Sequence, residues 1–477
     1  MKSCPYCYQP VEDNWSYCHH CNKPLIVNID SETEKRISHI YDDDIGNIYD
    51  YQVEDDLYEN NVIKDEKIEE RIEEINEILD EPQILGKTTG KFYLEKASLY
   101  YKNRDLATSL KFLEMALKNF KEENDILNLA ITHNEIGLLN EENGFYDNAI
   151  YQFQQSIENL QKLNESSKLI LIYNNLANIY YLIKDLEHSY EYYSKALDLA
   201  KQENLLSEEI KTSSNIVDIL FLLKNYDKIK RILTRNLDYF KQTGEIYGVI
   251  ITLIKIGKLN YHLGSDNYEY SHEKLIEALE LINSAELQKK LIHHNKAQLE
   301  WECSLYLGKL SLLQNNNKEA EDYLLKSLNS IRSYELGVNL NEAKVLKNLA
   351  KTYEEMGENQ RAIDYYTMAS EVYYKFGDDI KVASLKNEIA SVYLNKLKND
   401  SEAINNYEDA LEIFEDQSYM KESADILQKL GDIYINKSII ELALSHWEKA
   451  RDIYREILDE VNLNLVMEKI NTLNNSN

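Results

Sequence analysis

Four cysteines near the start of the chain are the side chains best suited to chemistry. Cys4 and Cys7 form one Cys-x2-Cys pair, and Cys18 and Cys21 form a second. Two such pairs place four thiolates on two tight turns, which suits tetrahedral Zn²⁺ with Zn–S bonds of ~2.3 Å. Four sulfurs complete the shell and leave no position for water, so the spacing predicts one structural zinc ion and no catalytic metal.

Other chemistries remain open for these cysteines. The same four thiols could hold iron or perform thiol redox reactions, and His19 or His20 could replace one thiolate. The fifth cysteine, Cys303, lies alone far along the chain. Because a disulfide framework spreads its cysteines through the body it crosslinks, this distribution favours a reducing compartment.

Composition excludes several classes of function. The chain has 83 acidic and 53 basic residues in 477, a net charge of −30, which opposes nonspecific binding to phosphate backbones. No apolar stretch approaches the ~18 residues that a membrane helix needs. We therefore expect a soluble cytoplasmic protein.

No catalytic motif is found. The sequence lacks the phosphate-binding patterns G-x-x-x-x-G-K-[ST] and G-x-G-x-x-G, the zinc-protease pattern H-E-x-x-H and the nucleophile pattern G-x-S-x-G. Only 14 glycines and 4 prolines interrupt the chain, which indicates mostly helix. We expect binding, not an enzyme.

The chain reads as three segments. Residues 1–28 hold the cysteines, and residues 29–82 form an acidic linker, with 20 acidic and 5 basic side chains between Asp30 and Pro82. Isoleucines at helical spacing within 65–80 predict an amphipathic helix, which either caps the next domain or docks on a partner. Residues 83–477 form the third segment.

A repeat of about forty residues organises this third segment. A small or apolar residue recurs there, in several units one helical turn before a tyrosine, as Ala97 lies before Tyr100, and we call it the marker. The nine markers are Ala97, Gly137, Ala177, Val217, Gly257, Gly308, Ala350, Ala390 and Gly431. Successive differences are 40, 40, 40, 40, 51, 42, 40 and 41, so nine related units follow one another.

A second helix follows each marker with its own pattern of small and large residues. Examples are Ala149, Phe153 and Ser156, and later Ala443, Trp447 and Ala450. Small residues let two antiparallel helices approach closely, while the aromatic side chain fills the space between pairs. The fourth unit departs from the pattern, and the 51-residue step before Gly308 suggests lengthened helices.

The pattern resembles tetratricopeptide repeats, and the long period with Asn174-Asn175-Leu176-Ala177 resembles the repeats of kinesin light chains and related microbial scaffold proteins. The resemblance implies an all-α, right-handed superhelical solenoid of about nine helix-turn-helix repeats with a C-terminal capping helix. The cysteine segment, with Cys4-Pro5-Tyr6-Cys7, resembles the short zinc ribbons of prokaryotic proteins. The expected architecture is therefore a zinc ribbon followed by a solenoid.

In this family the residues three and two before the marker and one after it tend to face the concave groove. Amides there suit the backbone of an extended peptide, and a lysine pair suits a carboxylate. Asparagine is abundant throughout the chain, so composition alone is an alternative explanation. The predicted groove residues are Asn134, Asn174, Asn175, Asn178, Asn215, Lys347, Asn348, Lys351 and Asn387.

These features predict a protein-protein interaction scaffold or adaptor that binds a partner peptide or protein in the groove, with the zinc ribbon as an accessory contact. The alternative is a transcriptional or signalling regulator, whose ribbon contacts nucleic acid or polymerase while the repeats sense a peptide. An intramolecular contact between the acidic linker and the groove is a further possibility. The partner itself cannot be named from sequence.

Overall fold

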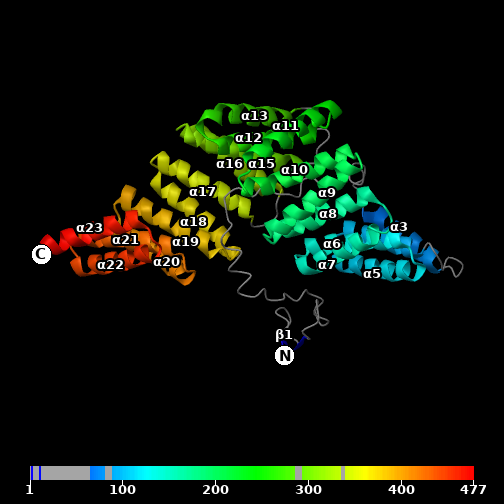
Figure 1. Cartoon of the computed structure of the whole chain (residues 1–477), viewed down its shortest axis with the longest axis horizontal. Coiled ribbons are helices and arrows are strands. Elements are labelled where there is room, and N and C mark those ends of the chain that lie inside the picture. The colour runs from blue at the N-terminus through cyan, green and yellow to red at the C-terminus, as the bar shows by residue number, and fades with distance from the viewer. Residues whose placement is uncertain are drawn as a thin grey trace. The chain divides into compact units, whose positions relative to one another are not determined.

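The computed structural model describes residues 2–3, 10–11, 65–80, 89–284, 293–334 and 339–476 (Figure 1). The chain divides into two compact units, Met1–Tyr41 and Asp42–Asn477. In the first unit, the short strands β1 (Lys2–Ser3) and β2 (Pro10–Val11) pair antiparallel.

The described residues of the second unit form nine antiparallel helix pairs, each with a first and a second helix, which confirms the predicted all-helical repeat array. The pairs are α4 (Thr89–Lys102) with α5 (Leu106–Glu123), α6 (Ile126–Glu142) with α7 (Tyr146–Leu160), α8 (Ser166–Leu182) with α9 (Leu186–Gln202), α10 (Leu206–Leu222) with α11 (Tyr226–Thr243), α12 (Ile246–Leu263) with α13 (Tyr268–Ile282), α15 (His293–Leu313) with α16 (Asn317–Tyr334), α17 (Leu340–Glu355) with α18 (Asn359–Lys375), α19 (Asp379–Val392) with α20 (Asp400–Asp416), and α21 (Met420–Asn436) with α22 (Ile440–Glu456).

The turns explain why the period is forty residues. One residue with positive φ recurs every twenty residues from Arg104 to Gly264. The residue after it donates its N–H back into the ending helix, as Asp125 does to the Phe120 carbonyl at 2.9 Å, and this closes the helix end. Asp125 then caps the next helix by accepting from the Asn128 N–H. A helix of 17 residues such as α6 and a turn of three residues make a unit of twenty residues, and the two helices of a pair therefore give the period of forty.

The markers lie where the two helices of a pair approach most closely. Gly137 faces Phe153, and a Cβ atom on Gly137 would lie 2.6 Å from that ring. Where the marker is alanine, the same space holds a tyrosine or a leucine: Ala177 and Tyr193 are both fully buried, and Ala97 packs with Leu113. The prediction placed these large side chains between neighbouring pairs, whereas the structure packs each of them against the marker of its own pair, as an aromatic ring at Phe153 and as a leucine at Leu275 and Leu324.

Serine hydroxyls fasten the second helix to the first. Ser189 Oγ donates to the Ala177 carbonyl at 2.6 Å, and Ser156 Oγ donates to the Ala130 carbonyl at 2.8 Å. In the irregular fourth pair, Asn236 takes the place of Ser156, and its amide reaches the Ile210 carbonyl at 3.4 Å. The larger side chain at this position therefore preserves the same inter-helix bond.

Two irregular steps in the repeat have structural causes. Between Ala390 and Gly431 the extra residue is absorbed in a π-helical turn, η4 (Tyr393–Leu397), which follows α19. Before Gly308 part of the longer step lies in α15, whose 21 residues exceed the 17 of α6 or α8. Another part lies in the turn before α13, where the short helix η3 (Ser265–Asn267) delays the second helix, so that Gly257 meets Leu275. The stretch 285–292, between α13 and α15, lies outside the described residues.

Single helices cover both ends of the array. Helix α3 (Asp65–Asp80) lies where the sequence predicts an amphipathic helix, and its Ile68, Ile72 and Ile75 pack with Leu99 of α4. At the other end, α23 (Glu460–Ser476) packs against α22, and Val466 and Ile470 contact the Trp447 cluster. Both helices bury apolar side chains of the terminal pairs, as capping elements of a repeat array do.

Candidate binding surface on the first helices

First helices of neighbouring pairs contact one another directly, as in α6 with α8, α8 with α10, α12 with α15 and α15 with α17. The predicted groove residues lie on these helices. We number positions from the marker, so that −3, −2 and +1 are the residues three before, two before and one after it. The sequence predicts that these three positions form the binding surface.

Asparagines at −2 and −3 form a ladder between successive first helices. The Asn175 amide donates to Asn134 Oδ1 at 2.9 Å, and the Asn215 amide donates to Asn174 Oδ1 at 3.3 Å. In both bonds a residue at −2 reaches the residue at −3 on the preceding first helix. Asn387 takes part in the same way, because Lys429 Nζ donates to its Oδ1 at 3.0 Å.

The remaining bonds of these amides are also internal. The Asn174 amide donates to Thr212 Oγ1 and to the Ile170 carbonyl, both at 2.9 Å. Asn178 Oδ1 accepts from the Tyr193 hydroxyl of α9. Because a buried polar group without a partner is costly, these bonds stabilise the contact between neighbouring first helices. The role of the asparagines in partner binding stays a prediction.

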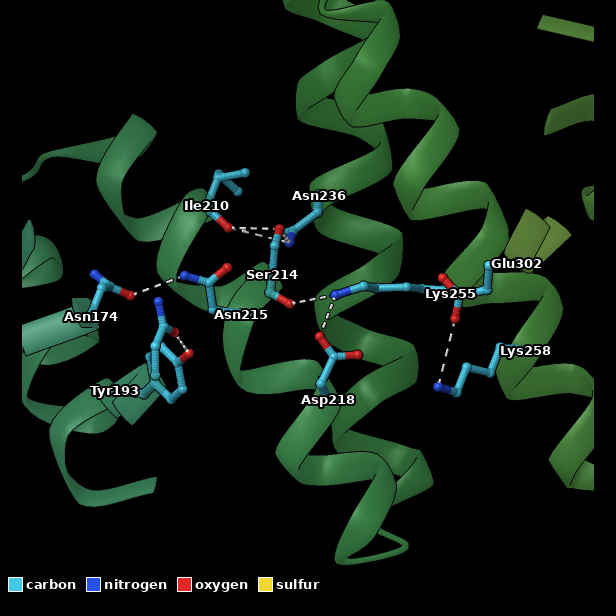
Figure 2. A network of polar contacts seen from close by, with 11 residues as sticks. Asn174, Tyr193, Ile210, Ser214, Asn215, Asp218, Asn236, Lys255, Lys258 and Glu302 are labelled. Atoms are coloured by element: carbon cyan, nitrogen blue, oxygen red, sulfur yellow. Dashed lines mark hydrogen bonds and ion pairs between the residues drawn. The ribbon is translucent and has the colours of Figure 1, made fainter. Parts of the chain in front are cut away.

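Charged groups continue the network on α10, α12 and α15 (Figure 2). Figure 2 shows Lys255 reaching from α12 toward α10, where its Nζ lies 2.8 Å from Asp218 Oδ2 and 3.0 Å from the Ser214 carbonyl. Lys258 points toward α15, where its Nζ lies 3.8 Å from Glu302 Oε1. The Lys258 side chain is 2% exposed, so this lysine is buried beside a carboxylate and the ring of Phe221.

Two buried tyrosines adjoin the ladder and differ in their partners. Tyr193 donates to Asn178, whereas the Tyr181 hydroxyl has no hydrogen-bond partner among the described residues. Burial, followed by the nearby Asp218 carboxylate, raises the pKa of both hydroxyls well above its usual value. Both phenols therefore stay neutral, and Tyr181 keeps an unused donor next to this surface.

The predicted residues on α17 differ from the asparagine ladder. The Asn348 amide donates to the Lys344 carbonyl of its own helix at 2.8 Å. Lys347 is half-buried, and Lys351, one helical turn further on, is exposed. The structure therefore places the predicted lysine pair on one first helix with at least one ammonium group in solvent.

Sequence reasoning missed Asp218, Lys255, Lys258 and Tyr181. The first three occupy positions +1, −2 and +1 of the fourth and fifth pairs, so the same register rule could have found them. Tyr181 lies four residues after its marker, outside the positions expected to face the groove, so the sequence gave no signal for it. Whether a phenol has a partner depends on neighbouring helices.

The predicted zinc ligands Cys4, Cys7, Cys18 and Cys21 lie outside the described residues, so their prediction is untested. Within the part of the chain that the structure describes, no group of histidine, cysteine or acidic side chains is arranged to hold a metal. Cys303 is fully buried, donates to the Leu275 carbonyl at 3.1 Å, and has a raised pKa because of burial.

Two stretches, residues 128–202 and 302–375, match the family model described as tetratricopeptide repeat. These stretches are tetratricopeptide repeats. Residues 392–477 match the model described as soluble NSF attachment protein, SNAP. No curated protein matches the chain in sequence. None of the described helices is long and apolar enough to cross a membrane.

Solved structures are similar to the chain at low sequence identity. The apo form of the quorum sensor NprR from B. thuringiensis matches with a TM-score of 0.52 and 15% identity, covering 76% of this chain and 98% of NprR. A Rap protein complexed with competence and sporulation factor matches with a TM-score of 0.39 and 14% identity, covering 83% of this chain and 94% of the Rap chain. The NprR likeness supports a tetratricopeptide-like solenoid.

Proposed function

We propose that this protein is an adaptor that binds a peptide or protein segment of a partner along its first helices and performs no catalysis. The observation that carries the proposal is the recurrence of polar residues at positions −3, −2 and +1 of successive tetratricopeptide-like pairs, where the asparagines of α6, α8 and α10 are buried and Lys351 of α17 is exposed. This surface supplies side chains from several helices to one extended ligand.

The internal bonds of the ladder support this proposal by fixing the first helices relative to one another. The Asn134–Asn175 and Asn174–Asn215 bonds join three consecutive first helices. A surface whose helices are already held in place has little freedom to lose on binding, so less of the interaction energy is spent on ordering. The asparagine ladder thus holds the first helices in place, and exposed side chains at the same positions, such as Lys351, contact the partner.

We infer that Cys4, Cys7, Cys18 and Cys21 hold one structural Zn²⁺. The donor set fits the ion, because four thiolates suit its tetrahedral preference, and β1 and β2 pair on either side of Cys4 and Cys7. Bound zinc would stabilise a segment too small to bury a sufficient apolar core. Its surface would add a second contact to the partner, and two linked weak contacts gain from effective concentration.

Site-specific photo-crosslinking tests the adaptor function in the full chain. A benzophenone amino acid replaces Lys351, the exposed residue at +1 on α17, and the matched control replaces Lys449, which is exposed on the second helix α22. We expect a discrete crosslinked protein from the native lysate with the probe at 351 and not at 449. Identical products at both positions, or none at 351, contradict binding along the first helices.

A further inference from the structure

The N-terminal end of the repeat array carries opposite charges on two helices. On α3, Glu69, Glu73 and Glu77 are exposed and recur every four residues, so they follow one side of the helix, and we call them the acidic stripe. On α5, Lys111 and Lys118 are exposed and lie two helical turns apart, and we call them the basic stripe. The same end of the array therefore presents charges of both signs to solvent.

Helices α3 and α5 are neighbours because both pack against α4. Ile72 of α3 packs with Leu99 of α4, and α4 forms the first helix pair with α5. Lys96 of α4 connects the two outer helices, since its Nζ donates to Asn76 Oδ1 of α3 at 2.6 Å and lies 4.0 Å from the centre of the Phe112 ring of α5. The two stripes thus belong to adjacent helices with a single lysine between them.

Neither stripe is neutralised within the described part of the chain. None of its five side chains has an ion-pair partner among the described residues, whereas Glu74 of α3 pairs with Arg71 at 2.8 Å. Burial, followed by the nearby Lys111 ammonium group, lowers the pKa of Lys96. The basic stripe therefore adds positive charge beside a lysine that is already buried, and an external carboxylate would relieve that repulsion.

We propose that this protein forms a two-fold symmetric dimer in which the acidic stripe of each copy meets the basic stripe of the other. A two-fold contact needs a surface that is complementary to itself, and opposite charges on adjacent helices meet this condition. The lengths also agree, because at about 1.5 Å per residue Glu69 and Glu77 lie about 12 Å apart along α3, and Lys111 and Lys118 about 10.5 Å apart along α5. Each exposed charge pair is weak alone, and the symmetry doubles their number.

The presence of both signs favours a second copy over other anionic ligands. A nucleic acid or an acidic peptide would use the basic stripe alone and would be repelled by the acidic stripe beside it, whereas a second copy uses both. Each chain carries a net charge of −30, and at about 0.15 M salt the Debye length of about 8 Å screens this repulsion more than the attraction between facing stripes.

The dimer has a consequence for partner binding. Its contact involves α3 and the second helix α5, so positions −3, −2 and +1 on the first helices take no part in it. One assembly therefore presents two copies of the surface proposed above, and a partner with two binding segments gains from effective concentration. The dimer itself does not depend on that binding function.

Charge reversal tests the dimer in the full chain by sedimentation equilibrium. One variant carries Glu69→Lys with Glu77→Lys, and the other carries Lys111→Glu with Lys118→Glu. We expect wild-type dimers at about 0.15 M salt and at least about a tenfold higher dissociation constant for either variant, because each brings like charges together. All four residues are exposed, and circular dichroism checks that both variants keep their helices.

Combining the reversals separates this contact from a general effect of charge. Mixed together, the two variants should form heterodimers, because one has two basic stripes and the other two acidic ones. A chain with all four substitutions should form homodimers again. The control, Lys375→Glu with Lys449→Glu on α18 and α22, should change the dissociation constant less than about twofold. A wild-type chain that is monomeric at about 100 μM, a mixture that stays monomeric, or an equal loss in the control overturns the proposal.

Further comparisons exclude other occupants of the basic stripe. If the lysine reversal dissociates the dimer and the glutamate reversal does not, the acidic linker or another acidic segment of the second copy binds α5, and the contact with α3 is wrong. If nuclease treatment abolishes the dimer, bound nucleic acid joins the copies instead. Glu114→Gln removes an exposed carboxylate between Lys111 and Lys118, so it should strengthen the dimer, and weaker association of this variant contradicts the proposal.

Discussion

At the scale of single residues, positions −3, −2 and +1 hold two kinds of side chain: some bond one first helix to the next, and others are exposed to solvent. Asn134, Asn174, Asn175 and Asn215 bond to one another between helices. Lys351 is exposed on the same set of positions. The asparagine amides on α6, α8 and α10 therefore have other surroundings than the Lys351 ammonium on α17, although all of them occupy the same positions relative to the marker.

The two buried tyrosines beside the ladder give opposite expectations. Tyr181→Phe removes a hydroxyl that has no partner in the described structure, so we expect the free energy of unfolding to rise by about 1 kcal/mol. Tyr193→Phe removes the donor to Asn178, so we expect the free energy of unfolding to fall by about 1–2 kcal/mol. Urea unfolding followed by circular dichroism measures both variants. Destabilisation by Tyr181→Phe equal to that of Tyr193→Phe would show that the Tyr181 hydroxyl has an unrecognised partner.

At the scale of elements, close approach within each pair depends on the size of the marker. Gly137 lies against Phe153 of α7, and Gly431 lies in the same way against Trp447 of α22. The alanine marker Ala177 packs with Tyr193 at the corresponding place, and Ala97 packs with Leu113. In each pair the size of the marker is thus matched to the large side chain that it faces, so a larger marker requires a smaller side chain opposite it.

Gly137→Ala should overpack the second pair. The added methyl group would lie 2.6 Å from the Phe153 ring, so either the ring or the helix must move, and we expect a loss of about 1–3 kcal/mol. The matched control is Gly144→Asn in the turn of the same pair, where nothing lies within 4 Å and the equivalent turns hold Asn124 and Asn164. Thermal unfolding of both variants provides the comparison, and an equal loss in the control contradicts the overpacking argument.

At the scale of the whole molecule, the two compact units have different sources of stability. The repeats bury successive apolar clusters between helices, from the one around Ile72 to the one around Trp447. The first unit includes the cysteine segment, which by our proposal depends on a metal ion. The repeat array should therefore keep its structure when metal is removed.

Metal removal tests the separation of these units. We expect one zinc ion per chain by elemental mass spectrometry, falling to none after Cys4→Ser with Cys18→Ser. Because the repeats bury their own core, their far-ultraviolet circular dichroism and melting midpoint should stay unchanged. The matched control is Cys303→Ala, which alters the buried cysteine of the repeats and should leave the zinc content at one. A chain that carries iron, or no metal, contradicts the zinc proposal.

Much of the fold followed from local sequence, because a helix pair requires its small and aromatic residues at fixed separations along the chain. The spacing from Ala97 to Gly431 predicted nine pairs, and the structure has them. The comparisons leave the right-handed superhelix as a prediction. The periodicity of one helix also placed Lys347 and Lys351 on the same face of α17, and their role in the groove stays a prediction.

Contacts between pairs were decided by the tertiary structure alone. Asn175 and Asn134, or Lys255 and Asp218, lie about forty residues apart in sequence, and they meet only because each first helix is placed against the preceding one. A sequence pattern shows that two side chains share a register, but their distance depends on how neighbouring pairs pack. The same placement leaves the Tyr181 hydroxyl unpaired in the described structure and pairs that of Tyr193.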